Sequence, residues 1–102
     1  MTTTTVYQQL AALGYPIAYG YHSKPQNLPY LCLLGAGQDH FEADNTYYTS
    51  KDNWQLEYYF KVKDPSVEQS IEALLLQNGY KYDKSEDVYI EDEDVFVIYY
   101  DI

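Results

Sequence analysis

The chain changes its hydrophobic repeat from two residues to about 3.6 within the stretch between Trp54 and Gly79. Apolar residues first alternate with polar ones, which predicts a strand with one buried face. Asp64 and Pro65 then suit a helix N-cap and a first helical position, where the missing proline N–H costs nothing. Aliphatic residues follow at helical spacing until Gly79, which favours the left-handed conformation that ends helices. This stretch therefore predicts a strand, a turn and a helix.

Shorter patterns predict the remaining elements. Thr5 and Gln8 fit a capping box, and Gly14 ends the helix that follows. Gly35-Ala36-Gly37 is expected to break a strand. Further strands are predicted over residues 17–22, 30–34, 46–50, 80–83, 88–90 and 95–102, with loops or turns at 38–45, 51–53 and 91–94. This order predicts one α+β domain over residues 1–102, a mostly antiparallel sheet with two helices packed on it.

The same patterns predict which side chains form the core. In the sheet we expect one buried face, and in the second helix one apolar stripe that packs on it. The sheet residues are Leu31, Leu33, Leu56, Tyr58, Phe60, Val97 and Tyr99, and the helix residues are Val67, Ile71, Leu74 and Leu75.

Charge is distributed unevenly along the chain. The net charge is −10, arginine is absent, and residues 1–38 hold a single charged side chain, that of Lys24. The remaining residues therefore carry −11. Because phosphate backbones are bound by clustered Lys and Arg, this balance predicts no specific binding to nucleic acid. The nearly uncharged N-terminal third suits a surface that meets other subunits without desolvating charge.

Tyrosine and cysteine usage add two expectations. Fourteen tyrosines are more than a core of this size can hide, so several should stand on an assembly surface. The single cysteine, Cys32, excludes an internal disulfide, and its apolar surroundings predict a small buried side chain. No apolar run approaches the ~18 residues of a membrane span, and no signal-peptide pattern is found. We expect a protein of a reducing cytosol, without a membrane partner.

No group of residues predicts catalysis or a cofactor. Asp39, His40, Glu42 and Asp44 could gather around a metal ion, but their spacing matches no established ligand pattern. The run Glu91-Asp92-Glu93-Asp94 lacks the alternate spacing and central glycine of a calcium loop. Paired catalytic carboxylates come from separate elements that face a cleft, whereas these four form one exposed turn. The sequence therefore predicts neither an enzyme nor a bound cofactor.

Several segments together resemble a known family. They are LGYPIAYG at residues 13–20, LPYL at 28–31, ADN at 43–45, WQLEYY at 54–59, KDP at 63–65, the helical run 68–75, and VIYY at 97–100. In this order they resemble the small structural proteins of head–tail joining modules in long-tailed phages and prophages. The similarity is to the tail-terminator, or tail-completion, type and covers nearly the whole chain.

This resemblance implies a tail-terminator-like fold and assembly into a homo-oligomeric ring, usually sixfold. Such a ring caps the tail tube and meets the head connector, so the partners would be tail-tube and connector proteins. The location would be the head–tail junction of the virion, after synthesis in the host cytoplasm. The family has no catalytic residues to carry over, and Trp54 and the acidic run depart from its pattern. The candidate assembly or lumen residues are Glu91, Asp92, Glu93, Asp94, Tyr47 and Tyr59.

An acidic DNA mimic that inhibits a host nuclease or restriction system is the alternative. Mimics spread carboxylates over a whole face at phosphate-like spacing. Here seven of the sixteen acidic residues fall between Asp83 and Asp94, and Glu57, Glu68 and Glu72 are scattered. The uneven spacing favours the assembly protein.

Overall fold

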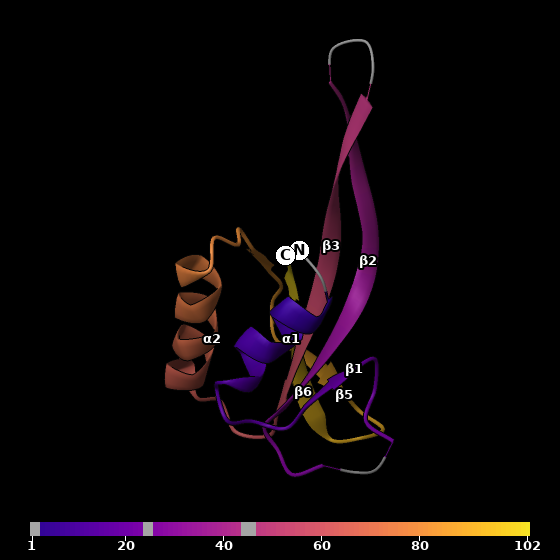
Figure 1. The fold of residues 1–102 in the computed structure, drawn as a ribbon. Coiled ribbons are helices and arrows are strands. Elements are labelled where there is room, and N and C mark those ends of the chain that lie inside the picture. The colour runs from indigo at the N-terminus through magenta and orange to yellow at the C-terminus, as the bar shows by residue number, and fades with distance from the viewer. Residues whose placement is uncertain (1–2, 24–25, 44–46) are drawn as a thin grey trace.

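The computed structural model has two helices on one face of a six-stranded sheet (Figure 1). It describes residues 3–23, 26–43 and 47–102. The helices are α1 (Thr3–Ala11) and α2 (Pro65–Gln77), and the strands are β1 (Ile17–Tyr19), β2 (Tyr30–Ala43), β3 (Tyr47–Phe60), β4 (Asp83–Lys84), β5 (Val88–Ile90) and β6 (Val95–Asp101). The spatial order is β1-β2-β3-β6-β4, and β5 also pairs with β6. The predicted α+β class is confirmed, with the parallel pair β1–β2 as the exception in an antiparallel sheet.

The strand–turn–helix unit forms as the sequence predicts. The Asp64 carboxylate accepts a hydrogen bond from the Ser66 N–H at 3.1 Å, and Pro65 is the first residue of α2. Gly79 has a φ of +82°, and the Tyr80 N–H bonds back to the Leu75 carbonyl at 2.9 Å. Such a left-handed residue followed by a return bond is a common helix end.

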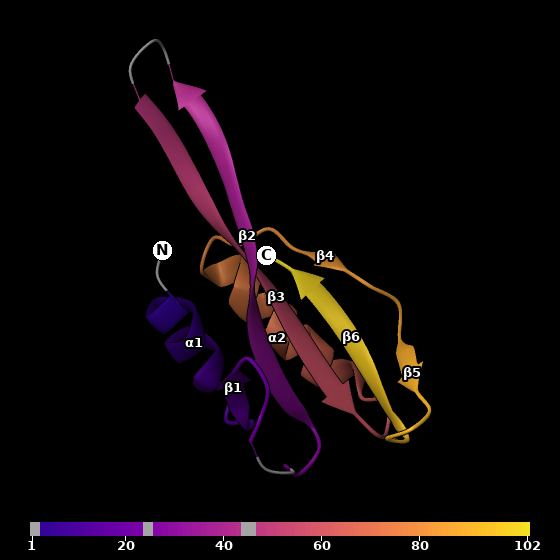
Figure 2. The ribbon, with the colours of Figure 1, turned by 90° about the vertical axis from the view of Figure 1, so that its right-hand side faces the viewer.

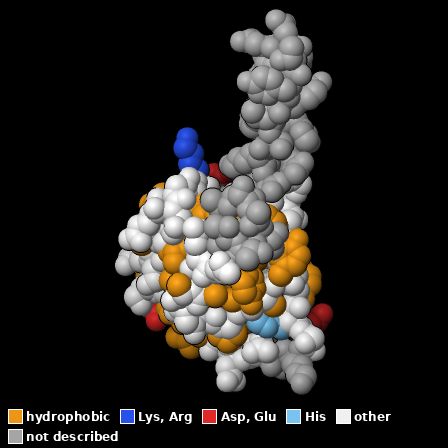
Figure 3. Space-filling view, viewed as in Figure 1, with side chains coloured by type: hydrophobic (Ala, Val, Ile, Leu, Met, Phe, Trp, Pro, Cys, Tyr) orange, Lys and Arg blue, Asp and Glu red, His pale blue; other side chains and the backbone are white. Residues whose placement is uncertain are grey.

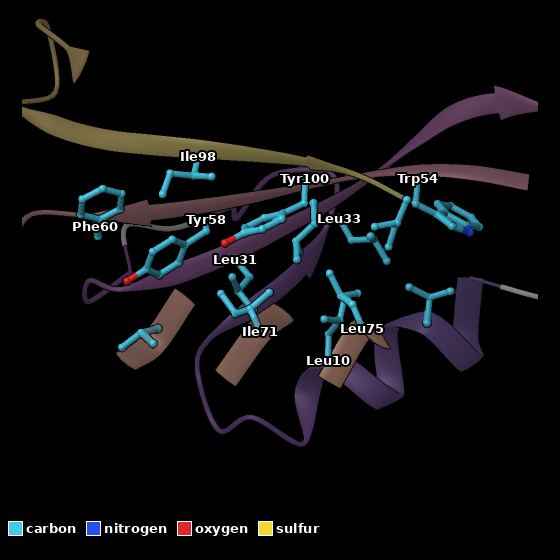
Figure 4. Packing of buried hydrophobic residues seen from close by; sticks show 14 residues of the cluster. Leu10, Leu31, Leu33, Trp54, Tyr58, Phe60, Ile71, Leu75, Ile98 and Tyr100 are labelled. Carbon is cyan, nitrogen blue, oxygen red and sulfur yellow. The ribbon is translucent and has the colours of Figure 1, made fainter. Parts of the chain in front are cut away.

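The core lies between the helices and the inner face of the sheet (Figure 4). Strands β2 and β3 contribute Leu31, Leu33 and Leu56, all fully buried. Buried side chains of α1 and α2 pack against them: Val6, Leu10, Val67, Ile71 and Leu75. Leu74 is only partly buried at the edge of this cluster. Burying each of the larger aliphatic side chains contributes about 1.5–3 kcal/mol, so this interface carries most of the stabilisation of the domain.

The predicted inner face of β6 is wrong by one residue. Tyr58 pairs with Ile98 and Leu56 with Tyr100, so Ile98 and Tyr100 face the helices. Val97 and Tyr99 instead belong to a second apolar cluster on the opposite face. Because β6 is apolar on both faces, alternation along its sequence does not reveal which side is inner. A one-residue slip exchanges all of its side chains between faces.

The centre of the chain forms one long hairpin rather than separate short strands. The predicted break at Gly35–Gly37 and turn at 51–53 are wrong, because β2 and β3 each run for 14 residues. The predicted loop at 38–45 is wrong over residues 38–43, and its residues 44 and 45 lie outside the described residues. Ala36 and Gly37 together oppose Asn53 in a bulge, where Gly37 has a φ of +87°. A bulge accommodates the extra residue and bends the ribbon without ending it. The hairpin projects far beyond the helices (Figures 1 and 2), and the molecule measures 51 × 27 × 24 Å.

The other elements differ from prediction mainly at their ends. Helix α1 begins before Thr5, and β1 ends at Tyr19, short of His22. The strand expected over residues 80–83 is reduced to Asp83–Lys84. The turn at 91–94 is confirmed. In the described part of the chain, neither helix is long and apolar enough to cross a membrane.

The buried stripe of α2 makes a quantitative prediction. Replacing Leu75, which is fully buried, with Ala should lower the free energy of unfolding by about 2–5 kcal/mol, because a cavity remains. The matched control is Leu76→Ala, since Leu76 is 61% exposed and should change stability by no more than about 0.5 kcal/mol. Urea denaturation measures both, and equal effects would show that the helix face is misassigned.

Candidate assembly site

The hairpin extends well past the strands that flank it. Strand β1 pairs with β2 only at residues 31–33, and β6 pairs with β3 only from Gln55 to Phe60. Beyond the bulge, from the pair Gln38–Asp52 to the pair Ala43–Tyr47, β2 and β3 pair only with each other. We call residues 38–43 and 47–52 the arm. Among the described residues no third strand lies beside it.

The backbone of the arm offers hydrogen bonds at both edges. Trp54 and Ile102 exchange both N–H···O=C bonds at 2.8 Å, so the backbone N–H and C=O groups of even-numbered β3 residues point away from β2. The bulge adds its extra residue to β2 and leaves the alternation along β3 unchanged, so the N–H and C=O of Ser50 also point away from β2. On β2 the partners of Lys51 and Thr49 are Asp39 and Phe41, which leaves the N–H of His40 pointing outward. Each edge therefore presents unpaired donors and acceptors.

Trp54 connects the arm to the body. Its side chain is 7% exposed and packs in the main core cluster. The Tyr19 ring meets it edge-on, with centroids 6.1 Å apart. Gly35 faces both rings, since a Cβ there would lie 3.6 Å from the Tyr19 hydroxyl and 3.7 Å from the indole. Trp54 thus anchors the root of the arm.

The N-terminal third forms a flank with little charge. Tyr19 and Tyr21 are 57% and 66% exposed, in line with the expectation that some tyrosines stand on the surface. The Tyr7 hydroxyl donates to the Ile17 carbonyl at 2.9 Å and ties α1 to β1. In Figure 3 the face over α1 shows mostly apolar and neutral polar side chains, with charged ones near its margins. We call the exposed surface of residues 6–23, which contain no Asp, Glu, Lys or Arg, the neutral flank.

The acidic turn is exposed, but its four carboxylates differ. Asp94 has a φ of +53°, contacts the Lys61 ammonium and accepts a hydrogen bond from the Tyr89 hydroxyl at 2.6 Å. The Lys61 hydrogen bond, and then that from Tyr89, lower the pKa of Asp94. In the described part of the chain, the carboxylates of Glu91, Asp92 and Glu93 make no hydrogen bond or ion pair. Asp94 thus holds the turn, while the other three carboxylates have no partner among the described residues.

Tyr59 is not part of an exposed surface, contrary to the prediction. It is 7% exposed, stacks on Tyr30 with centroids 4.8 Å apart, and donates its hydroxyl to Glu57 Oε1 at 2.6 Å. Burial and then the hydrogen bond to Glu57 raise the pKa of Tyr59. A hollow of about 590 Å³ beside this ring is lined partly by Leu28 and Val95. Tyr47 begins β3, and its side chain lies outside the described part of the structure.

Cys32 lies in the second apolar cluster, on the sheet face away from the helices. It is 1% exposed, and burial, followed by the charge of Glu57, raises the pKa of its thiol to about 11. The prediction of a small buried side chain is confirmed, and the neutral thiol is a poor nucleophile.

Lysines neutralise several of the acidic residues. Lys84 Nζ lies 2.8 Å from Glu68 Oε1 and 2.9 Å from Glu72 Oε2, which also accepts the Tyr100 hydroxyl at 2.8 Å. Lys63 Nζ lies 2.8 Å from Glu68 Oε2, an ion pair without hydrogen-bond alignment, and 3.0 Å from an oxygen of Asp87. Burial raises the pKa of Glu68 and of Glu72, but the lysine contacts outweigh it, so both are lowered. These pairs hold α2 against β4.

The described residues contain no cluster of His, Cys, Asp and Glu that could hold a metal. Three of the four residues that could have gathered around a metal belong to β2, namely Asp39, His40 and Glu42, and their side chains lie outside the described part of the structure. The fourth, Asp44, lies outside the described residues.

Comparison of the sequence with models of known protein families gives no match, and a search among curated proteins finds no significant relative.

The lysine pairs predict a pH-dependent stability. A glutamate with a lowered pKa stabilises the fold above its unfolded-state value of about 4.3, and that contribution is lost as the pH falls through the folded-state value. Glu72→Gln should therefore be less stable than the wild type near neutral pH, and this difference should shrink below about pH 4. Urea denaturation across this range measures the effect. Glu86→Gln, on the exposed β4–β5 link, is the control, and an unchanged gap for Glu72→Gln at low pH would contradict the assignment.

The acidic turn gives a separate prediction. The triple variant Glu91→Gln, Asp92→Asn, Glu93→Gln should keep the free energy of unfolding within about 0.5 kcal/mol, since exposed side chains without partners contribute little. Asp94→Ala should lower the melting temperature, because it removes two contacts and because Ala tolerates positive φ less well than Asp. Thermal melts compare the two, and a triple variant that unfolds as easily as Asp94→Ala would contradict this division.

Proposed function

We propose that this chain is a structural assembly protein of a tailed phage or prophage. It forms a ring at the head–tail junction, caps the tail tube and meets the head connector, as a tail terminator does. The observation that carries this proposal is the arm, a two-stranded ribbon that leaves the body and has no third strand beside it in the described part of the chain.

A projecting two-stranded ribbon is unfavourable in an isolated protein. Two paired strands alone are marginally stable in water, and long open edges invite pairing with other chains. Natural monomers avoid such edges or cover them. An arm that leaves the core from an anchored root, at Trp54, is therefore best explained by a partner that receives it during assembly.

The charge distribution supports a ring with directional contacts. A ring requires a patch on one side of the subunit that matches a different patch on the other. The neutral flank can be buried without desolvating charge, and Tyr19 and Tyr21 offer the large amphipathic side chains that interfaces favour. Glu91, Asp92 and Glu93 would then face the lumen or the next component, where like charge would let DNA pass without binding.

The alternative, a DNA mimic, has weaker support. Four carboxylates form ion pairs with lysines, those of Glu68, Glu72, Asp87 and Asp94. Asp101 accepts a hydrogen bond from the Gln55 side-chain amide at 3.4 Å. A mimic needs carboxylates that are free to meet a basic cleft. The resemblance to head–tail joining proteins also favours assembly.

The test is complementation of a phage that lacks the gene, read by electron microscopy. We expect loss of the protein to leave tails of abnormal length, or tails separate from full heads, and the wild-type gene to restore joined particles. The triple acidic-turn variant, which should fold normally, should restore joining poorly or impair DNA passage. Conservative Val62→Ala, at an exposed site on another loop, is the control.

Two results would contradict the proposal. Normal infectious particles without the protein would exclude an assembly role. Stoichiometric capture of a host nuclease or restriction enzyme by the purified protein, together with inhibition of that enzyme, would favour the mimic instead.

A further inference from the structure

We propose that the two edges of the arm are the contacts that join subunits. The β2 edge of one copy pairs with the β3 edge of the next, and this inference rests on the proposed ring assembly. The occupant of each open edge is thus a second copy of this chain.

The arm is long enough to make such a contact. The outward backbone groups on the β2 edge belong to Gln38, His40 and Glu42, and those on the β3 edge belong to Tyr48, Ser50 and Asp52. Each edge thus offers three residues whose N–H and C=O have no partner within the arm. Pairing along such an edge supplies main-chain hydrogen bonds in register, as in strand addition to other sheets.

The open edges of the body are poorer partners. Strand β1 is three residues long, and the outward carbonyl of Ile17 already accepts the Tyr7 hydroxyl. Strand β5 is equally short, and the nearby residues Glu86 and Asp87 are acidic like the arm. Among the described strands, only another arm offers an edge of matching length.

Charge disfavours a contact between two β2 edges and favours one between β2 and β3. The β2 segment of the arm carries Asp39 and Glu42, whereas the β3 segment carries Lys51 with Asp52. Joining two β2 edges would set carboxylates of two copies against each other, which is unfavourable across paired strands. Joining β2 to β3 sets the acidic segment against the one that holds the only lysine of the arm. This contact is heterologous, so repeating it builds a ring when the rotation between copies closes, and a closed ring leaves no arm edge unpaired.

The experiment removes one outward N–H at a time. Proline is tolerated in a strand where its N–H position faces outward, so His40→Pro blocks the β2 edge and Ser50→Pro blocks the β3 edge. Neither change removes a hydrogen bond between β2 and β3. His40→Thr and Ser50→Thr keep the N–H and serve as matched controls. Native mass spectrometry and negative-stain microscopy report the assembly, and thermal melts report folding of the body.

We expect the wild type and the threonine variants to form rings, and each proline variant alone to remain monomeric. An equimolar mixture of the two proline variants should form heterodimers, because each supplies the edge that the other lacks. These heterodimers also show that both arms are folded.

The outcomes separate this inference from the proposed function. Rings that persist in both proline variants would overturn the arm-to-arm contact and leave the ring assembly standing. A wild-type dimer that is lost in Ser50→Pro but kept in His40→Pro would indicate a symmetric β3–β3 contact and also overturn the inference. A wild-type chain that remains monomeric, alone and with tail-tube and connector proteins, would contradict both.

Discussion

Strand β3 is the element on which the rest of the structure depends. Its inner half pairs with β2 on one side and β6 on the other, while its outer half pairs with β2 alone. Leu56 and Tyr58 face the helices, and Glu57 and Tyr59 face away, so one strand contributes to both apolar clusters. Because β3 runs without a break from the core into the arm, the packed half of the strand fixes the position of the root of the arm.

Much of the charge of the molecule is paired around α2 and β4, away from the neutral flank. Lysines pair with Glu68, Glu72 and Asp87 around α2 and β4, where ionic contacts fasten the helix to the sheet. The neutral flank and the open backbone edges of the arm carry the features that favour protein contacts. In the proposed assembly, the neutral flank would add little repulsion between copies of this strongly acidic chain.

Local sequence patterns correctly predicted the elements that are specified by residues close together in the chain. Asp64, Pro65 and Gly79 specify where α2 begins and ends because each acts through its own backbone conformation or a neighbouring N–H. The turn at 91–94 follows from the same reasoning. Of the candidate site, the exposure of the acidic turn was predictable, whereas the burial of Tyr59 was not. Its ring is covered by the segment around Leu28 and by Tyr30, which only the folded chain brings beside it.

The sequence by itself determined the α+β class, the boundaries of α2, the burial of Cys32 and the uneven charge. Each of these depends on composition or on residues close together in the chain. The tertiary structure decided the inner face of β6 and the length of the hairpin. Residues on both faces of β6 are apolar, so its orientation is set by register against β3. The polar residues beyond Gly37 form strands because a partner strand satisfies their backbone, which is information that their own side chains do not carry.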